Sequence, residues 1–131
     1  MIVKLNEPHK AAHLFQGWQE TMIWSCLQHV MGAIYMPEGD DRSALALLAD
    51  FGFLAGEVND ELIAQALRLS GQKFLILVPR NEQWAASIRR VYGHRAQQRT
   101  RWAIKKEYIR IYGNRYHIPS PNEKALMKLF H

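Results

Sequence analysis

Apolar residues recur at helical spacing in two segments near the N-terminus. Residues 7–18 have a proline at their second position, suited to a first helical turn, and residues 20–32 repeat the spacing. The apolar positions expected to face inward are Ala11, Leu14, Phe15 and Trp18 in the first segment and Ile23, Leu27, Val30 and Met31 in the second. The pattern predicts two short helices packed against an apolar surface, with Gly17 ending or bending the first.

Residues 32–57 contain two runs typical of strands. The first, "GAIYMP", closes at Pro37 and leads into the acidic turn "EGDDR". The second, residues 43–57, is apolar in both phases of alternation, as expected for a strand covered on both faces. Fully extended, it would span about 50 Å, whereas a globule of this size is about 36 Å across. We therefore expect it to bend or break at residues 50–52, where Gly52 tolerates a bulge.

Two well-delimited helices follow, separated by a buried strand. "NDELIAQALRLSG" has Asn59 or Asp60 as its cap and Gly71 as its end, and "NEQWAASIRRVYG" runs from Asn81 to Gly93. The inward stripes are Leu62, Ile63, Ala66 and Leu67 in the first helix and Trp84, Ile88, Val91 and Tyr92 in the second. With "KFLILVP" between them, the segment predicts a single-domain α/β (α+β) fold, a mixed sheet flanked by helices.

Composition narrows the classes of protein that remain. A chain of 131 residues suits one domain with one core. No apolar run approaches the roughly 18 residues needed to span a bilayer, and the N-terminus lacks the regions of a signal peptide. The single cysteine cannot form an internal disulfide. We therefore expect a cytoplasmic protein with no membrane partner.

Charge is distributed unevenly along the chain. The net charge is +5, but residues 1–88 carry six Lys and Arg against ten Asp and Glu, whereas residues 89–131 carry eleven against two. The net charge therefore changes from −4 in the first segment to +9 in the second. Such a change indicates a binding surface for an anion, a polyanion or an acidic partner. It also fits a basic tail added to a neutral body.

The basic stretch has the alternation of a half-buried strand. Arg99, Arg101 and Lys105 fall on one face, and Trp102 shares the other with Ile104. A solvated face is the simplest interpretation. The sharper hypothesis is an anion-binding face formed by Arg99, Arg101 and Lys105 together with Arg80, which precedes the open amides of a helix. Nucleic acid is disfavoured as the partner, since no recognised module accompanies the charge.

The sequence gives little evidence for a metal site, a reactive cysteine or a coenzyme loop. His9 and His13 have helical zinc spacing, but no third ligand is evident, so no metal site is predicted. Cys26 lies in an amphipathic segment and is expected to pack rather than react. Residues 68–73 loosely match the Q/R-x-x-G-x-G/A loop that holds the pyrophosphate of coenzyme A, but they end a helix, where the dipole has the wrong sign for an anion.

Four collinear blocks resemble the N-terminal part of a bacterial GNAT-type acetyltransferase group that includes zwittermicin A resistance proteins. The blocks are "IWSCLQHVMGAIYM", "SALALLADFGFLAGE", "FLILVPRNEQWAASIRRVYGHRA" and "RTRWAIKKE", within residues 5–107. The resemblance implies an N-terminal α/β domain, a GNAT-like half, followed in those proteins by a separate GNAT domain. That second domain carries the acetyl-coenzyme A loop and transfers acetyl to an amine.

After residue 107 the sequence departs from the family pattern. We therefore expect residues 1–107 to form the α/β domain and residues 108–131 a divergent basic tail, with no C-terminal catalytic domain. A capping box at residues 120–123 predicts a short helix with Leu126, Met127 and Phe130 on its apolar edge. Such a helix must dock on its own body, on a second copy to give a homodimer, or on a partner protein.

Three functions follow as hypotheses. The leading one is a GNAT acetyltransferase-related domain, non-catalytic alone, with a binding or assembly role and no cofactor. The resemblance assigns no catalytic or cofactor residue to any position here, so enzyme activity is left open. The first alternative is a minimal N-acetyltransferase, the only case in which acetyl-coenzyme A is the cofactor. The second is a small basic nucleic-acid-binding protein.

Overall fold

The computed structural model describes residues 1–102 and 111–119, with side chains for residues 1–96 and 115–119. The strands are β1 (Ile2–Lys4), β2 (Ala33–Pro37), β3 (Ser43–Leu48), β4 (Phe51–Gly56), β5 (Phe74–Pro79), β6 (Gln97–Trp102) and β7 (Ile111–Pro119). The helices are the 3-10 segments η1 (Pro8–Leu14) and η2 (Gly93–Arg95), with α1 (Thr21–Leu27), α2 (Asp60–Ser70) and α3 (Glu82–Tyr92).

All seven strands form one mixed sheet in the order β1-β2-β3-β4-β5-β7-β6. Among these strands, β4 and β5 form the one parallel pair, in register from Phe51 opposite Ile76 to Leu54 opposite Pro79. Helix α2 makes the crossover that a parallel pair requires. The predicted single mixed sheet flanked by helices is therefore confirmed.

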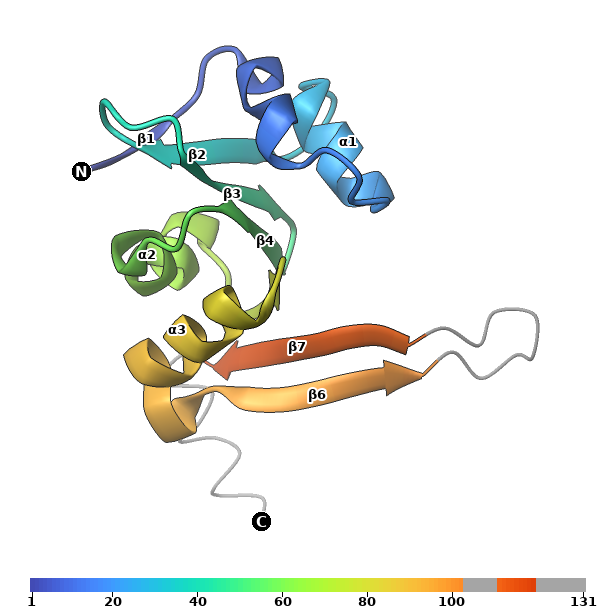
Figure 1. Ribbon diagram of the computed structural model, residues 1–131, viewed down its shortest axis with the longest axis vertical. Coiled ribbons are helices and arrows are strands. Elements are labelled where there is room, and N and C mark those ends of the chain that lie inside the picture. The colour runs from blue at the N-terminus through green and yellow to red at the C-terminus, as the bar shows by residue number, and fades with distance from the viewer. Residues whose placement is uncertain (103–110, 120–131) are drawn as a thin grey trace.

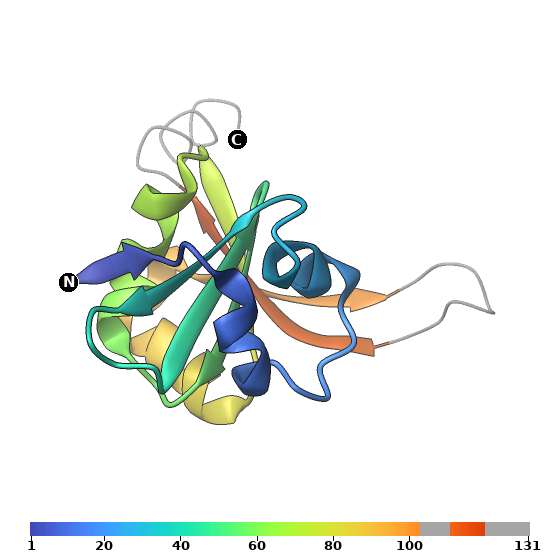
Figure 2. The same ribbon diagram turned by 90° about the horizontal axis from the view of Figure 1, so that it is seen from above.

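Helices cover both faces of the sheet (Figures 1 and 2), and each face has its own core. Helices α2 and α3 cover one face, where leucines of β3, β4 and β5 pack around Trp84. Segments η1 and α1 cover the other face, where alanines of β3 and β4 pack with Phe15, Ile23 and Phe53. The central strands are buried on both sides, which explains why residues 43–57 are apolar in both phases.

The run at residues 43–57 breaks into the hairpin β3–β4. Leu48 pairs with Phe51, so the turn consists of Ala49 and Asp50 alone. Ala49 takes the left-handed conformation, with φ of 52°. The predicted break is confirmed, but the predicted glycine bulge is wrong: Gly52 pairs regularly with Leu47, because a tight turn relieves the excess length without disturbing the ladder.

The N-terminal helices are shorter than the periodicity predicts. The first is a 3-10 segment, with its proline in the first turn as expected. Helix α1 ends at Leu27, and the chain then turns through His29 and Gly32, whose φ angles are 58° and 79°. The prediction that Val30 and Met31 face inward is wrong, because the turn carries both out of the helical phase; their side chains are 70% and 63% exposed.

The two later helices agree closely with prediction. Asn59 caps α2 and Asn81 caps α3, each accepting a backbone N–H at 3.1 Å. Gly71 ends α2 with φ of 67°. By contrast, β7 was not predicted: it lies within the segment interpreted as a tail, yet pairs between β5 and β6. The predicted helix after residue 120 falls outside the described residues.

Within the described chain, no helix combines the length and apolarity needed to cross a bilayer.

Glycine substitutions test the packing at the end of β4. A Cβ added to Gly56 would lie 2.1 Å from the Arg42 carbonyl oxygen, whereas one added to Gly71 meets nothing within 4 Å. Both glycines have positive φ, so Gly71→Ala measures backbone strain alone, about 1–2 kcal/mol. Gly56→Ala adds the clash and should lower the free energy of unfolding by at least about 3 kcal/mol in urea titration. Equal losses for the two variants would contradict this packing.

Candidate functional site

The carboxyl ends of β4 and β5 form the place where a ligand is expected. Because these strands are parallel, both ends lie at the same edge of the sheet, and each leads directly into a helix: β4 into α2 and β5 into α3. Ligands of open α/β sheets bind at the carboxyl ends of parallel strands, and helix N-termini favour anions. We call this region the β4/β5 junction, residues 54–61 and 79–84.

The helix amides at the junction are already partly used. The Asn59 side chain accepts from the backbone N–H of Leu62, and the Asn81 side chain accepts from that of Trp84. Each helix start therefore has an internal cap in the position an anion would take. At the start of α3, where the sequence analysis placed open amides beside Arg80, one amide is thus already capped by Asn81.

The two strands stay paired down to the junction. Their register continues to Leu54 opposite Pro79, and the backbone N–H of Arg80 then donates to the Leu54 carbonyl at 3.0 Å. On its other side, β4 is paired with β3 without interruption as far as Gly56. A cofactor lodged between β4 and β5 needs strands that separate. Over this range they do not.

Trp84 lies in the first turn of α3, just beyond the paired strands. Its side chain is fully buried, and its indole N–H donates to the Gly56 carbonyl at 2.9 Å. The last carbonyl of β4 is thus tied to the first turn of α3. Sequence analysis placed Trp84 in the core correctly but gave no sign of this bond, because Gly56 is distant in the chain.

Charge at the junction is balanced internally. Asp60, Glu61 and Glu82 lie in the first turns of the two helices, where acids stabilise the dipole and oppose an anion. Arg90 donates to both carboxylate oxygens of Asp60, at 2.8 and 2.9 Å, and Arg89 pairs with Glu82. The two arginines in the last turn of α3 thus neutralise one acid in the first turn of each helix.

The four residues predicted as an anion-binding face lie in different settings. Arg80 is exposed, donates to the Gln16 carbonyl at 3.0 Å and stacks over Trp18 at 5.1 Å. It therefore ties the linker before α1 to the end of β5. The Arg99 and Arg101 backbones belong to β6, two strands away from β5 and so roughly 10 Å across the sheet. Lys105 is outside the described residues.

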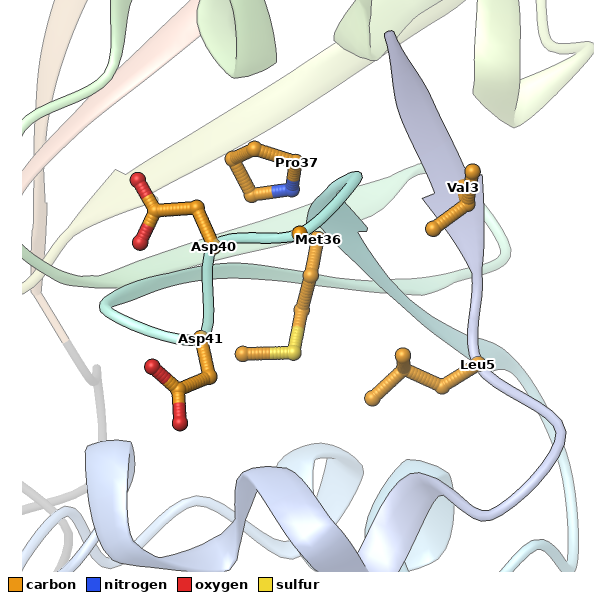
Figure 3. Close-up of a pocket in the computed structure, with 7 residues that line it drawn as sticks. Val3, Leu5, Met36, Pro37, Asp40 and Asp41 are labelled. Atoms are coloured by element: carbon orange, nitrogen blue, oxygen red, sulfur yellow. The ribbon is translucent and has the colours of Figure 1, made fainter.

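A separate hollow lies at the opposite part of the sheet, near β1 and the turn after β2 (Figure 3). It has a volume of about 430 Å³, and Val3, Leu5 and Met36 supply apolar walls. Asp40 and Asp41 lie at its rim. Arg42 holds the pKa of Asp40 below its usual range through hydrogen bonds to both carboxylate oxygens.

The remaining candidates have structural surroundings. Cys26 is fully buried, with its thiol 3.5 Å from the Leu47 carbonyl, which confirms the prediction that it packs. His13 lies 3.1 Å from the Lys10 carbonyl through its Nδ1 atom. No group of three or more His, Cys, Asp or Glu side chains suited to a metal occurs in the portion described.

Sequence analysis missed one buried cation. Arg115 on β7 is 6% exposed, lies 3.6 Å from the Glu20 carboxylate and stacks over Phe51 at 5.7 Å. It joins β7 to the start of α1. In the sequence, this arginine lies in a segment for which no strand or helix was predicted. Without β7, nothing indicated that its side chain would be buried.

This geometry places the chain among the layered α/β domains in which two parallel strands each lead into a helix. In such domains, ligands bind at the carboxyl ends of those strands. A family model described as GNAT acetyltransferase matches residues 12–129. A solved structure of a GCN5-related N-acetyltransferase-like protein from Streptococcus suis is also similar, with 40% sequence identity and a TM-score of 0.61. No curated protein matches the chain.

The chain therefore belongs to the GNAT acetyltransferase family. The family match continues past residue 107 to residue 129, so it includes β7 as well as the four blocks recognised in the sequence. The similarity to the Streptococcus suis protein covers 77% of this chain and 41% of that one. The chain thus spans about two-fifths of the length of that relative.

Thiol chemistry tests the assignment of Cys26. Burial raises the pKa of this thiol above its usual range, so the folded state favours the neutral form. The stability that the buried neutral thiol contributes is fully present below the ordinary thiol pKa of about 8.5. It is lost as the pH rises through the higher pKa of the folded state. At pH 8 we expect an aromatic disulfide reagent to react at least about 100-fold more slowly with the native chain than with the chain in urea.

The control for the pH dependence is Cys26→Ala. Burial also raises the pKa of Tyr92, so wild type and Cys26→Ala should both lose stability at alkaline pH, but wild type should lose more. Rapid native labelling, or identical alkaline curves for the two proteins, would contradict the assignment.

Proposed function

We propose that this GNAT-fold domain performs no acetyl transfer by itself and serves in binding or assembly. The observation that carries the proposal is the closed β4/β5 junction: the strands remain paired to Leu54 and Pro79, and Trp84 is bonded to Gly56 beyond them. A diphosphate there would have to displace two asparagine caps and compete with Asp60 and Glu82 for their arginine partners. Each requirement disfavours coenzyme binding.

The longer relative supports a role within a larger acetyltransferase. This chain matches about two-fifths of the Streptococcus suis protein. We propose that the domain corresponds to the non-catalytic N-terminal half of the group that includes zwittermicin A resistance proteins, and that acetyl transfer belongs to a second domain. A cytoplasmic location fits the buried, unpaired cysteine.

A minimal N-acetyltransferase is the second candidate. One observation favours it: the chain has a seven-stranded sheet with a parallel pair and two helix starts at its carboxyl end. In that case the junction would open to admit acetyl-coenzyme A, and an amine would be the acceptor.

Calorimetric titration of the intact chain with acetyl-coenzyme A separates the two candidates. We expect no saturable heat up to about 1 mM coenzyme, which corresponds to a binding free energy weaker than about −4 kcal/mol. We also expect no release of free thiol with a panel of primary amines. Micromolar affinity, or thiol release above the uncatalysed rate, would establish the enzyme instead.

The basic C-terminal region requires a control for non-specific anion binding. Inorganic pyrophosphate is titrated alongside the coenzyme, at low and at physiological salt. Weak binding that is equal for both ligands and falls steeply with salt reflects surface charge, as expected for phosphate contacts. Arg80→Ala is the matched variant: specific coenzyme binding at the junction should weaken in this variant, whereas non-specific binding should change little.

A further inference from the structure

Strand β1 forms one edge of the described sheet. It pairs with β2 alone, in antiparallel register along its whole length. Backbone bonds fix this pairing just beyond both ends of the strand. The Glu38 N–H donates to the Met1 carbonyl at 2.7 Å, and the Leu5 N–H donates to the Ile34 carbonyl at 2.8 Å. The edge is therefore held firmly from one side.

The backbone groups of Ile2 and Lys4 point away from β2. In an antiparallel pair, residues that are bonded to the neighbouring strand alternate with residues whose N–H and C=O point to the other side. Met1 and Leu5 are bonded to β2, so by alternation Val3 faces β2 as well. Ile2 and Lys4 consequently each offer one donor and one acceptor at the open edge. Within the described residues, no third strand takes up these groups.

The hollow of about 430 Å³ lies beside this edge (Figure 3). In Figure 3, Val3 and Leu5 lie on one side of Met36, and Asp40 and Asp41 lie on the other. Val3 is half-buried and stands opposite Met36 in the register, so the two side chains share one face of the sheet. A side chain that an added strand places opposite Val3 therefore lies on the side of the hollow.

The charge around the hollow favours a basic ligand. Residues 38–42 contain three acids against one arginine. Arg42 is bonded to Asp40, whereas Asp41 is exposed and forms no hydrogen bond or ion pair with the described residues. Lysine and arginine side chains cover apolar surface with their stems and keep their charged heads at a polar boundary. They thus complement both the apolar walls and the acidic rim.

We propose that β1 and the hollow together bind an extended basic peptide segment of a partner protein, which joins the sheet as a further strand. Its backbone bonds to Ile2 and Lys4. Its side chains opposite Val3 and Leu5, two residues apart, are lysine or arginine and lie over the hollow. The intervening side chains lie on the other face, which they share with Lys4, so they are neutral rather than basic.

This partner makes the binding role proposed above specific and rests on it to that extent. The two proposals fail separately, however, because they concern different parts of the sheet. Peptide titration measures the β1 edge, and coenzyme titration measures the β4/β5 junction. A chain that binds coenzyme but no peptide and a chain that binds neither are therefore distinct results.

Amide hydrogen exchange of the intact chain, measured by NMR, tests the contact directly. The probe is a capped peptide of about seven alternating threonine and lysine residues, a typical strand length. The Lys4 amide should exchange rapidly in the free chain and at least about tenfold more slowly with saturating peptide. The Val3 amide, which already faces β2, is the internal control and should change much less.

Two substitutions at one position separate the backbone contact from charge. Lys4→Pro removes an N–H that points outward, so the bonds between β1 and β2 are kept. Lys4→Ala loses the same charge but retains the N–H. In fluorescence anisotropy with labelled peptide, wild type and Lys4→Ala should bind with a Kd of about 10–500 µM, and Lys4→Pro at least about tenfold more weakly. Circular dichroism checks folding; the exchange measurement on wild type decides if the proline variant does not fold.

A second pair of variants tests the acidic rim. Asp41→Asn should weaken peptide binding about two- to fivefold, as expected for an exposed ion pair. Asp50→Asn makes the same charge change beyond the opposite end of β3 and should have little effect. A peptide of alternating threonine and glutamate should not bind.

Four results would overturn the proposal. The first is no binding of the basic peptide at about 1 mM. The second is equal affinity of Lys4→Pro and Lys4→Ala. The third is binding of acetyl-lysine amide as tight as that of the peptide, because the hollow would then take a free amine rather than a strand. The last is protection of the Lys4 amide in the protein alone that rises with protein concentration, which would place a second copy at the edge.

Discussion

The bond between the Trp84 indole and the Gly56 carbonyl holds the end of the central strand against the helix that follows the next strand. It joins the end of β4 to the first turn of α3, with the Trp84 side chain fully buried and Gly56 half-buried. Leaving the buried indole N–H without a partner would cost about 1–3 kcal/mol, so this arrangement is strongly favoured. The same bond lies just beyond the end of the parallel pair, so one contact belongs both to the core and to the β4/β5 junction.

The two faces of the sheet differ because small and large residues alternate along β3 and β4. Leucines on one face pack against α2 and α3, and alanines on the other face pack against η1 and α1. The aromatic rings of Phe15, Trp18 and Phe53 fill the remaining volume on the alanine face. Farther along that face, the Glu20–Arg115 pair ties α1 to β7. It is 20% and 8% exposed at its side chains, so removal of one partner would cost more than removal of an exposed ion pair.

Local chemistry predicted most of the elements but not the relations among them. Asparagine caps and glycine stops located α2 and α3 almost to the residue, because these signals act within one turn. The end of α1 was misplaced, since Val30 continues the helical spacing while a turn fixed by tertiary contacts at Gly32 breaks the helix. Strand β7 was missed because residues 111–119 mix polar and apolar positions and gain their place only by pairing between β5 and β6. At the candidate site, both caps could be predicted from sequence, whereas the Trp84 bond could not.

Family membership and cofactor binding depend on different groups of the chain. Strand order and helix placement follow from the apolar pattern, which this chain shares with its relative at 40% identity. Diphosphate binding depends on backbone amides left open at a helix start, and those depend on a few residues at one turn. Here that turn contains Glu57, Asn59 and Asp60, which add negative charge and a cap on one of the amides. The interactions that stabilise the core are therefore distinct from those that would hold an anion.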